Sequence, residues 1–218
     1  SDQCSTDGEV GPMYGAQWRG YMGKDGIQRP DQFATLIKGL ISDPYGRRHV
    51  VDSWEASTIP ENNCSYDENV RNGKMAIAPC HSLYQCHVED INGVKNVNLK
   101  FTMRSSDTFL GLPANVSSYS LLLEIIGALT GYKANRVIWN GGDVHLYANH
   151  DKACGKLIEQ WRDRVKGKGI GFSSVELASE RACPTYILPK KFLELVNVET
   201  LDFSNEELVP LLISGLRD

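Results

Sequence analysis

Cys80 lies between a proline and a histidine in the run Ala78-Pro79-Cys80-His81, at the start of a segment that alternates like a strand. A thiol in this position can be a buried small hydrophobe, a metal ligand or a nucleophile. Free cysteine is among the most commonly buried residue types, so the position alone leaves all three roles open. The surrounding residues therefore have to decide among them.

A metal site is the first alternative, because Cys80, His81, Cys86 and His87 are all potential zinc ligands. If the segment is a strand, Cys80 and Cys86 share a face but stand about 20 Å apart, at roughly 3.3 Å per residue. A tetrahedral zinc needs its ligands within about 2.3 Å of the metal. The spacing argues against a shared site, and we expect no metal here.

A nucleophile is favoured by Arg104, the first residue of Arg104-Ser105-Ser106-Asp107. Asn92-Gly93 is a strong hairpin signal between two alternating segments, expected as strands at about 82–90 and 97–104. Antiparallel pairing would bring Arg104 close to the start of the first strand. A nearby guanidinium stabilises a thiolate over a thiol, which is how reactive cysteines arise.

The remaining pattern predicts elements that could support this hairpin. Apolar residues at helical spacing predict a helix over 31–42, with Asp31 as its cap. A nearly all-apolar stretch predicts a buried central helix over 118–131. Residues 55–74 look like a polar loop. Further expectations are a strand over 136–139 that Gly141-Gly142 would break, a helix around 149–165, and weaker strands after Gly171. Because these strands and helices do not alternate in regular βαβ units, they predict an α+β fold.

The composition is that of an ordinary globular chain. The 218 residues carry a net charge of −4, which gives no reason to expect a nucleic acid polymer as partner. No apolar run approaches the length of a membrane span. Residues 1–4 lack the features of a signal peptide, and six scattered cysteines suggest reduced thiols. We expect one domain over residues 1–218, cytoplasmic and not bound to a membrane.

Four motifs in order make the chain similar to the thymidylate synthase superfamily, which includes the phage-type pyrimidine hydroxymethylases. They are Gly11-Pro12-Met13-Tyr14-Gly15-Ala16-Gln17-Trp18-Arg19, Ala78-Pro79-Cys80-His81, Arg104-Ser105-Ser106-Asp107-Thr108-Phe109-Leu110-Gly111-Leu112-Pro113-Ala114-Asn115 and Gly141-Gly142-Asp143-Val144-His145-Leu146-Tyr147. The resemblance implies an α+β fold in which a mixed sheet packs against a buried central helix and one sheet face forms a homodimer.

The resemblance also implies catalytic roles. Cys80 would add to C6 of a pyrimidine nucleotide, so that C5 attacks the methylene group of 5,10-methylenetetrahydrofolate. Tyr14 and His81 would complete the network around the reacting ring. Asn115 would read the base edge, donating to O4 and accepting from N3–H.

Binding roles follow from the same resemblance. Arg104, with its planar guanidinium, would hold the 5′-phosphate together with Ser105. The homodimer partner would contribute Arg47 and Arg48 to that phosphate. The sugar hydroxyl would be bound by His145 and Tyr147. Further substrate contacts are expected from Gln85, Ser106 and Asp107, and folate contacts from Asp107, Leu110 and Gly111.

Departures from the synthase pattern indicate a hydroxymethylase. Synthases carry a pair of tryptophans just before the Gly-Pro turn, and the position of the second falls near Gln3 in this sequence. A polar side chain there would let water reach the exocyclic methylene intermediate. Residues 55–74 form a longer connection than synthases usually have, and residues 213–218 lack their apolar closing tail. We expect 5-hydroxymethyl-dUMP and unoxidised tetrahydrofolate, with thymidylate as the alternative product.

Substrate choice depends on position 115. The phage dCMP hydroxymethylase has an aspartate there, so Asn115 favours dUMP, although a flipped amide could pair with cytosine. We expect no counterpart before Gly11 to the family's N-terminal segment, which has another arginine loop and a proton-relaying glutamate. Either the sequence is a piece of a longer chain, or these residues come from elsewhere. This makes a nucleotide-binding module without catalysis a further hypothesis.

Overall fold

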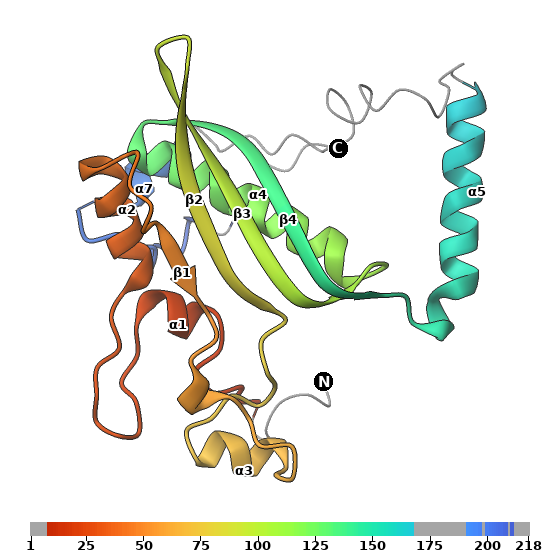
Figure 1. The fold of residues 1–218 in the computed structure, drawn as a ribbon, viewed down its shortest axis with the longest axis horizontal. Helices are drawn as coiled ribbons and strands as arrows, with labels where there is room; N and C mark the ends of the chain where they lie inside the picture. Colours follow the sequence, from red (N-terminus) through yellow and green to blue (C-terminus); the bar gives the residue numbers. More distant parts are fainter. Residues whose placement is uncertain (1–7, 168–190, 198, 209, 212–218) are drawn as a thin grey trace. The chain divides into compact units, whose positions relative to one another are not determined.

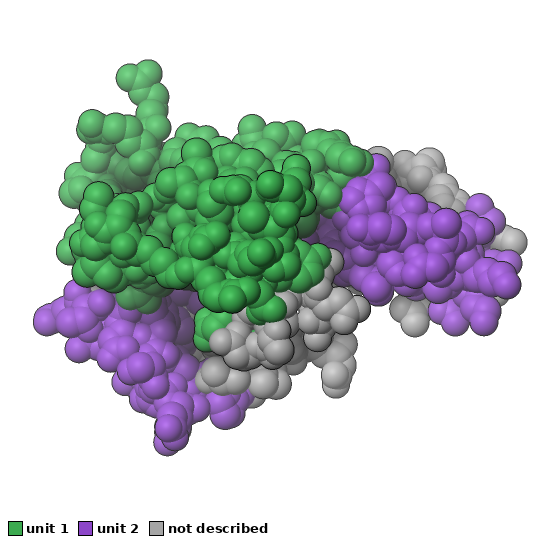
Figure 2. Space-filling model, turned by 90° about the horizontal axis from the view of Figure 1, so that it is seen from below, with its two compact units in different colours: residues 1–106, 126–143 green, residues 107–125, 144–218 purple. Residues whose placement is uncertain are grey.

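The computed structural model describes residues 8–167, 191–197, 199–208 and 210–211. Its internal contacts divide the chain into two units (Figure 2). Unit 1 contains residues 1–106 and 126–143, and unit 2 contains residues 107–125 and 144–218. The single domain over residues 1–218 stays a prediction.

A sheet of β1 (Val50–Asp52), β2 (His81–Ile91), β3 (Val94–Asp107) and β4 (Lys133–His145), in that order, is the centre of the fold (Figure 1). β2 pairs antiparallel with both β1 and β3. Asn92 and Gly93 join β2 to β3 with φ angles of 55° and 79°, the left-handed region that such a turn requires. The predicted hairpin is confirmed.

β4 lies parallel to β3, since contacts between the two strands advance in the same direction along both. Asn135 donates to Asn98 at 2.9 Å, and Asn140 donates to Thr102 at 3.5 Å. The sheet is therefore mixed, as the resemblance implied. The expected break at Gly141-Gly142 is wrong: β4 continues through both, because Gly142 lets the strand lie close to the Arg104 backbone.

The apolar face of the hairpin forms the core of unit 1. Every second residue of β3 is buried there, namely Val97, Leu99, Phe101 and Met103. The expected polar opposite face is only partly solvent-exposed, since Asn98 is just 1% exposed. Its side chain donates to Glu89 at 2.6 Å and accepts from Asn135, which offsets the cost of burying an amide.

α2 (Gln32–Ser42) forms as its apolar spacing predicts. The Asp31 carboxylate caps it by accepting a hydrogen bond from the Ala34 amide at 2.8 Å. Its buried stripe is Phe33, Leu36, Ile37 and Leu40.

α4 (Gly111–Thr130) begins earlier than the expected 118–131. Pro113 is compatible with this start, since the first turn of a helix does not use its N–H groups internally. Tyr119, Leu123, Ile126 and Leu129 form the buried stripe, while Leu121, Leu122 and Ile125 are only half-buried. By length and composition alone, α4 could span a membrane, a test that the core helix of a soluble protein also passes.

The expected polar loop over residues 55–74 contains η1 (Ala56–Thr58) and α3 (Tyr66–Arg71). Ser65 and Glu68 form a capping box at the start of α3: the Ser65 hydroxyl accepts from the Glu68 amide, and the Glu68 carboxylate accepts from the Ser65 amide. This reciprocal bonding starts a helix in a polar segment that lacks apolar periodicity.

Shorter elements complete the described chain. They are α1 (Gly15–Arg19), η2 (Ala148–His150), α5 (Asp151–Gly167) and α7 (Phe192–Leu195). α5 corresponds to the helix expected around 149–165. Most of the region after Gly171, where weaker strands are expected, lies outside the described residues.

The close approach of β4 to β3 gives a first testable prediction. A Cβ at position 142 would lie 2.8 Å from the Arg104 carbonyl oxygen, so Gly142→Ala should push the strands apart. We expect the free energy of unfolding to fall by about 1–3 kcal/mol, measured by urea denaturation. Gly155→Ala is the control, because a Cβ there meets nothing within 4 Å. Equal stability of the two variants would contradict the prediction.

Candidate active site

Cys80 lies directly before β2 and is half-buried. Its backbone is fixed on both sides: the carbonyl accepts from the Arg104 amide at 2.8 Å, and the amide donates to the Tyr14 hydroxyl at 2.9 Å. The expected approach of Arg104 to the start of the first strand is thus confirmed. The thiol-bearing residue is held between two elements far apart in the sequence.

Tyr14 has a backbone φ of 26°, an unusual value for a residue with a side chain. Tyr14 precedes α1. It follows Gly11, where a Cβ would overlap the Lys74 carbonyl oxygen, so only glycine fits at position 11. Burial raises the pKa of the Tyr14 phenol despite backbone hydrogen bonds from Cys80 and His81. At neutral pH the phenol is therefore protonated.

His81 stacks on Tyr14, with ring centroids 4.1 Å apart and ring planes at 12°. Trp18 lies beside the same imidazole at 6.4 Å and is fixed by donating from Nε1 to the Ser53 hydroxyl at 2.7 Å. Burial lowers the pKa of His81 from 6.5 to about 4. The imidazole next to Cys80 is consequently neutral at physiological pH.

Arg104 is exposed, but its guanidinium is anchored. Nε donates to the Pro79 carbonyl and Nη2 to the Ala78 carbonyl, both at 2.9 Å. The guanidinium carbon lies 5.6 Å from the centre of the Trp54 ring. Arg104 is thus a fixed cation beside the segment that carries Cys80.

The other expected binding residues of unit 1 differ in exposure. Ser105 is half-buried, whereas Ser106 is fully buried and its hydroxyl contacts the Met103 sulfur at 3.9 Å. Arg47 and Arg48 are exposed between α2 and β1. Gln85 is half-buried in the middle of β2.

Unit 2 contains a second group of expected site residues. The Asp107 carboxylate accepts from the Phe109 amide at 3.0 Å and the Leu110 amide at 3.5 Å. Burial opposes its ionisation, but these amides, that of Gly111 and nearby His150 hold the pKa of Asp107 below its usual range. Asp107 is therefore an anion that fixes the loop before α4.

Gly111 and Asn115 lie in the first turns of α4. A Cβ at position 111 would lie 3.4 Å from the Asp107 Cβ and 3.8 Å from the Asn115 amide nitrogen, so the three residues are neighbours. Leu110 is 58% exposed. The half-buried Asn115 and exposed Leu110 are placed where a ligand could reach them.

His145, the last residue of β4, forms an aromatic cluster with Tyr147 and His150. The rings of His145 and Tyr147 meet edge to face at 4.9 Å, and those of Tyr147 and His150 at 5.7 Å. The His145 carbonyl accepts from both the amide and the hydroxyl of Thr108. His150, whose Nδ1 is 3.8 Å from Asp107, is a polar residue that the sequence reasoning missed.

The metal alternative finds no support among residues 8–167 and the described residues after 190, where no three potential ligands gather. Cys86 is 1% exposed, and burial raises the pKa of its thiol to about 12. This cysteine is an inert core residue, unlike the half-buried Cys80.

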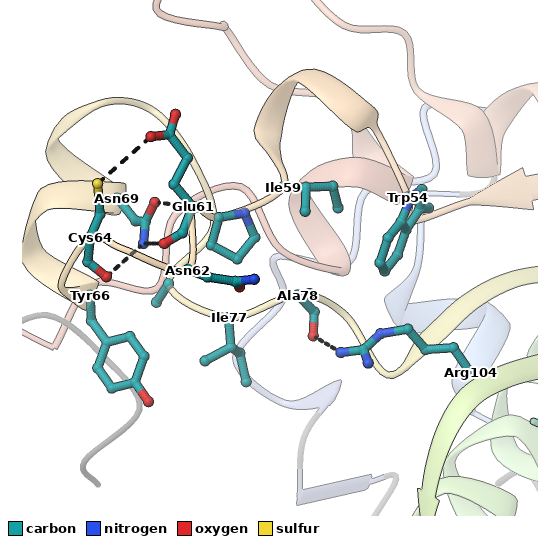
Figure 3. A pocket seen from close by; sticks show the side chains of 12 residues that line it. Trp54, Ile59, Glu61, Asn62, Cys64, Tyr66, Asn69, Ile77, Ala78 and Arg104 are labelled. Atoms are coloured by element: carbon teal, nitrogen blue, oxygen red, sulfur yellow. Dashed lines mark hydrogen bonds between the residues drawn. The ribbon is translucent and has the colours of Figure 1, made fainter. Parts of the chain in front are cut away.

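A cleft of about 410 Å³ opens beside Arg104 (Figure 3). Trp54 and Arg104 lie at one end, Tyr66 at the other, and Ile59 and Ile77 between them. Much of its wall is contributed by residues 59–69, the segment that the sequence predicted as a loop.

The structure thus combines an α+β fold and a mixed sheet with a half-buried cysteine whose backbone is bonded to an anchored arginine. A family model described as thymidylate synthase matches residues 2–168. The chain belongs to the thymidylate synthase family.

Curated relatives agree with this assignment. The chain is 37% identical over 191 residues to a probable thymidylate synthase of Escherichia phage T5, covering 88% of the chain and 54% of the relative. It is 33% identical over 205 residues to the thymidylate synthase of Francisella philomiragia, covering 94% and 66%. For that of Francisella tularensis, the identity is 39% over 177 residues, covering 81% and 59%. The chain thus spans between half and two thirds of these relatives.

The low pKa of His81 gives a prediction for stability against pH. Unfolding exposes the imidazole, whose pKa returns to about 6.5, so between pH 4 and 6.5 the unfolded chain binds the extra proton. Stability should therefore fall as pH drops through this window, by about 1.4 kcal/mol per pH unit at most.

His81→Asn removes this contribution. Urea unfolding at pH 7.5, 6.0 and 5.0 should show the variant regaining stability relative to the wild type as pH falls, because only the wild type buries a titrating imidazole. A stability difference that stays constant across the three pH values would contradict a buried neutral His81.

Proposed function

We propose that the chain is the nucleotide-binding and catalytic part of an enzyme that transfers a one-carbon unit to C5 of dUMP. The observation that carries the proposal is the double backbone anchoring of Cys80, by the Arg104 amide and the Tyr14 hydroxyl. This anchoring holds the half-buried Cys80 at the start of β2, next to the segment that binds the Arg104 guanidinium. A nucleophile and a phosphate-binding cation placed in this way could act on one small substrate.

The proposed reaction begins with Cys80. Its thiolate adds to C6 of the uracil ring, and the electron pair displaced from the C5–C6 double bond makes C5 a carbanion equivalent. 5,10-Methylenetetrahydrofolate supplies the one-carbon unit that C5 receives. Loss of the C5 proton, with breaking of the bond between the transferred carbon and the folate nitrogen, would leave a methylene group on C5. Hydride from the tetrahydrofolate would give the methyl product, or water the hydroxymethyl product, and the C6–sulfur bond breaks as the Cys80 thiolate leaves.

Neighbouring groups support this chemistry. The protonated Tyr14 phenol and the neutral His81 imidazole are stacked beside the Cys80 amide and can carry hydrogen bonds to the reacting ring without adding charge. Arg104 and Ser105 are proposed to hold the 5′-phosphate. Exposed Arg47 and Arg48 suit the proposed homodimer, in which a second copy lends them to the same phosphate.

The remaining contacts are proposed on the family resemblance alone. Asn115 reads the uracil edge, and His145 and Tyr147 bind the sugar hydroxyl. The folate is proposed to lie against Asp107, Leu110 and Gly111. The exposure of Leu110 and the small size of Gly111 are compatible with a planar ligand. A cytoplasmic location remains a prediction.

Two products are candidates. The reported relatives are named thymidylate synthases, which favours a methyl product, thymidylate with dihydrofolate. The polar Gln3, which lies outside the described residues, favours the hydroxymethyl product that the sequence predicted. Mass spectrometry of the nucleotide and folate products from dUMP separates the two.

Cys80→Ser tests the nucleophile. We expect release of tritium from [5-³H]dUMP to fall by about 10⁴-fold or more, because a serine hydroxyl is not ionised at neutral pH. Binding of dUMP, measured by equilibrium dialysis, should be nearly unchanged. Cys154→Ser, at a half-buried cysteine of α5, is the control and should keep full release.

Other outcomes separate the alternatives. If the wild type binds dUMP but releases no tritium, the chain is a nucleotide-binding module without catalysis. If Cys80→Ser keeps wild-type release, Cys80 has a structural role only and the proposed mechanism is wrong.

Asn115→Asp tests substrate choice. A protonated aspartic acid can donate to cytosine N3 and accept from its N4 amino group, whereas an asparagine amide suits uracil O4 and N3–H. We expect the ratio of kcat/KM for dCMP to that for dUMP to rise by about 100-fold, measured by tritium release from both nucleotides. An equal loss on both substrates would show that position 115 does not read the base.

A further inference from the structure

Trp54 contacts the proposed phosphate-binding arginine and has no role in the reaction described above. Its indole faces the Arg104 guanidinium, with 5.6 Å between the guanidinium carbon and the ring centre. Figure 3 shows both side chains at the same end of the cleft. Cations are attracted to the face of an aromatic ring at such distances, most strongly to that of tryptophan.

The hydrogen bonds of Arg104 fix only part of its guanidinium. Nε and Nη2 lie on one edge of the planar group, and that edge donates to the carbonyls of Pro79 and Ala78. Among the described residues, no hydrogen bond uses Nη1, so its donors are available to an anion. The two carbonyls hold this edge of the Arg104 guanidinium in place, and the Trp54 indole covers one of its faces.

The backbone on either side of Trp54 is itself held in place. The Ser53 amide donates to the Ser82 carbonyl at 2.7 Å, and the Trp54 amide donates to the Asp52 carboxylate at 2.7 Å. Glu55 accepts from Arg29 at 2.9 Å and forms an ion pair with it. The indole is thus presented from a fixed turn and can restrict where the guanidinium points.

We propose that Trp54 is a positioning residue that orients Arg104, so that its Nη1 edge faces the 5′-phosphate of the nucleotide. The contact limits the guanidinium to one plane before the substrate arrives, which lowers the entropy lost on binding. The inference rests on the proposed function in one respect, namely that the anion bound by Arg104 is the phosphate of a nucleotide.

The test compares two ligands that differ by the phosphate. Equilibrium binding of dUMP and of deoxyuridine is measured on the full chain by calorimetry. In Trp54→Leu, which keeps apolar bulk but lacks the ring, dUMP should bind about tenfold more weakly, equivalent to about 1.4 kcal/mol. Deoxyuridine affinity should change by less than about twofold, since it lacks the group that Arg104 holds.

Two further variants sharpen the comparison. Trp54→Phe retains an aromatic face and should recover part of the lost dUMP affinity. Tyr66→Ala removes an aromatic side chain of similar exposure, 39% against 37% for Trp54, from the other end of the cleft. It should leave the ratio of the two affinities at the wild-type value.

The outcomes distinguish this inference from the proposed function. If the wild type binds dUMP no more tightly than deoxyuridine, the phosphate role of Arg104 fails and both proposals are overturned. If the wild type prefers dUMP and Trp54→Leu keeps the same preference, only the positioning role is overturned. Equal weakening of both ligands in Trp54→Leu would mean a general structural role and would also overturn it.

Discussion

Three hydrogen bonds join Arg104 to the segment that carries Cys80, and the geometry of the candidate site depends on them. The Arg104 amide donates to Cys80, and its guanidinium donates to Pro79 and Ala78. One residue of β3 therefore fixes the thiol-bearing residue through its main chain and presents a cation through its side chain. A shift in the pairing of β2 with β3 would move both together.

Much of this arrangement follows from local sequence signals. Asn92-Gly93 sets the hairpin turn, and alternation of apolar residues sets which face of β3 is buried, so the approach of Arg104 to Cys80 could be predicted. The stacking of Tyr14 on His81 could not, because it joins segments without a shared pattern. The resemblance to a family supplied the role of Tyr14, but not its geometry.

The sequence-based expectations that differ from the structure do so for physical reasons. Gly141-Gly142 looks like a break in a strand, yet a glycine also permits close approach of a neighbouring backbone, and Arg104 is that neighbour. The helix α3 lies in a polar segment and was missed because its start is set by the capping box of Ser65 and Glu68. His150 was overlooked because its contact with Asp107 depends on tertiary structure.

The segment around α3 satisfies its own polar groups. The buried Asn69 side chain accepts from the Glu61 amide and donates to the carbonyls of Glu61 and Cys64. A segment with such internal hydrogen bonds can be lengthened or shortened at a small entropic cost, since the entropy of loop closure depends only weakly on loop length. Evolution could therefore vary this wall of the cleft, and with it the molecules that fit there, without disturbing the strand pairing that holds Cys80.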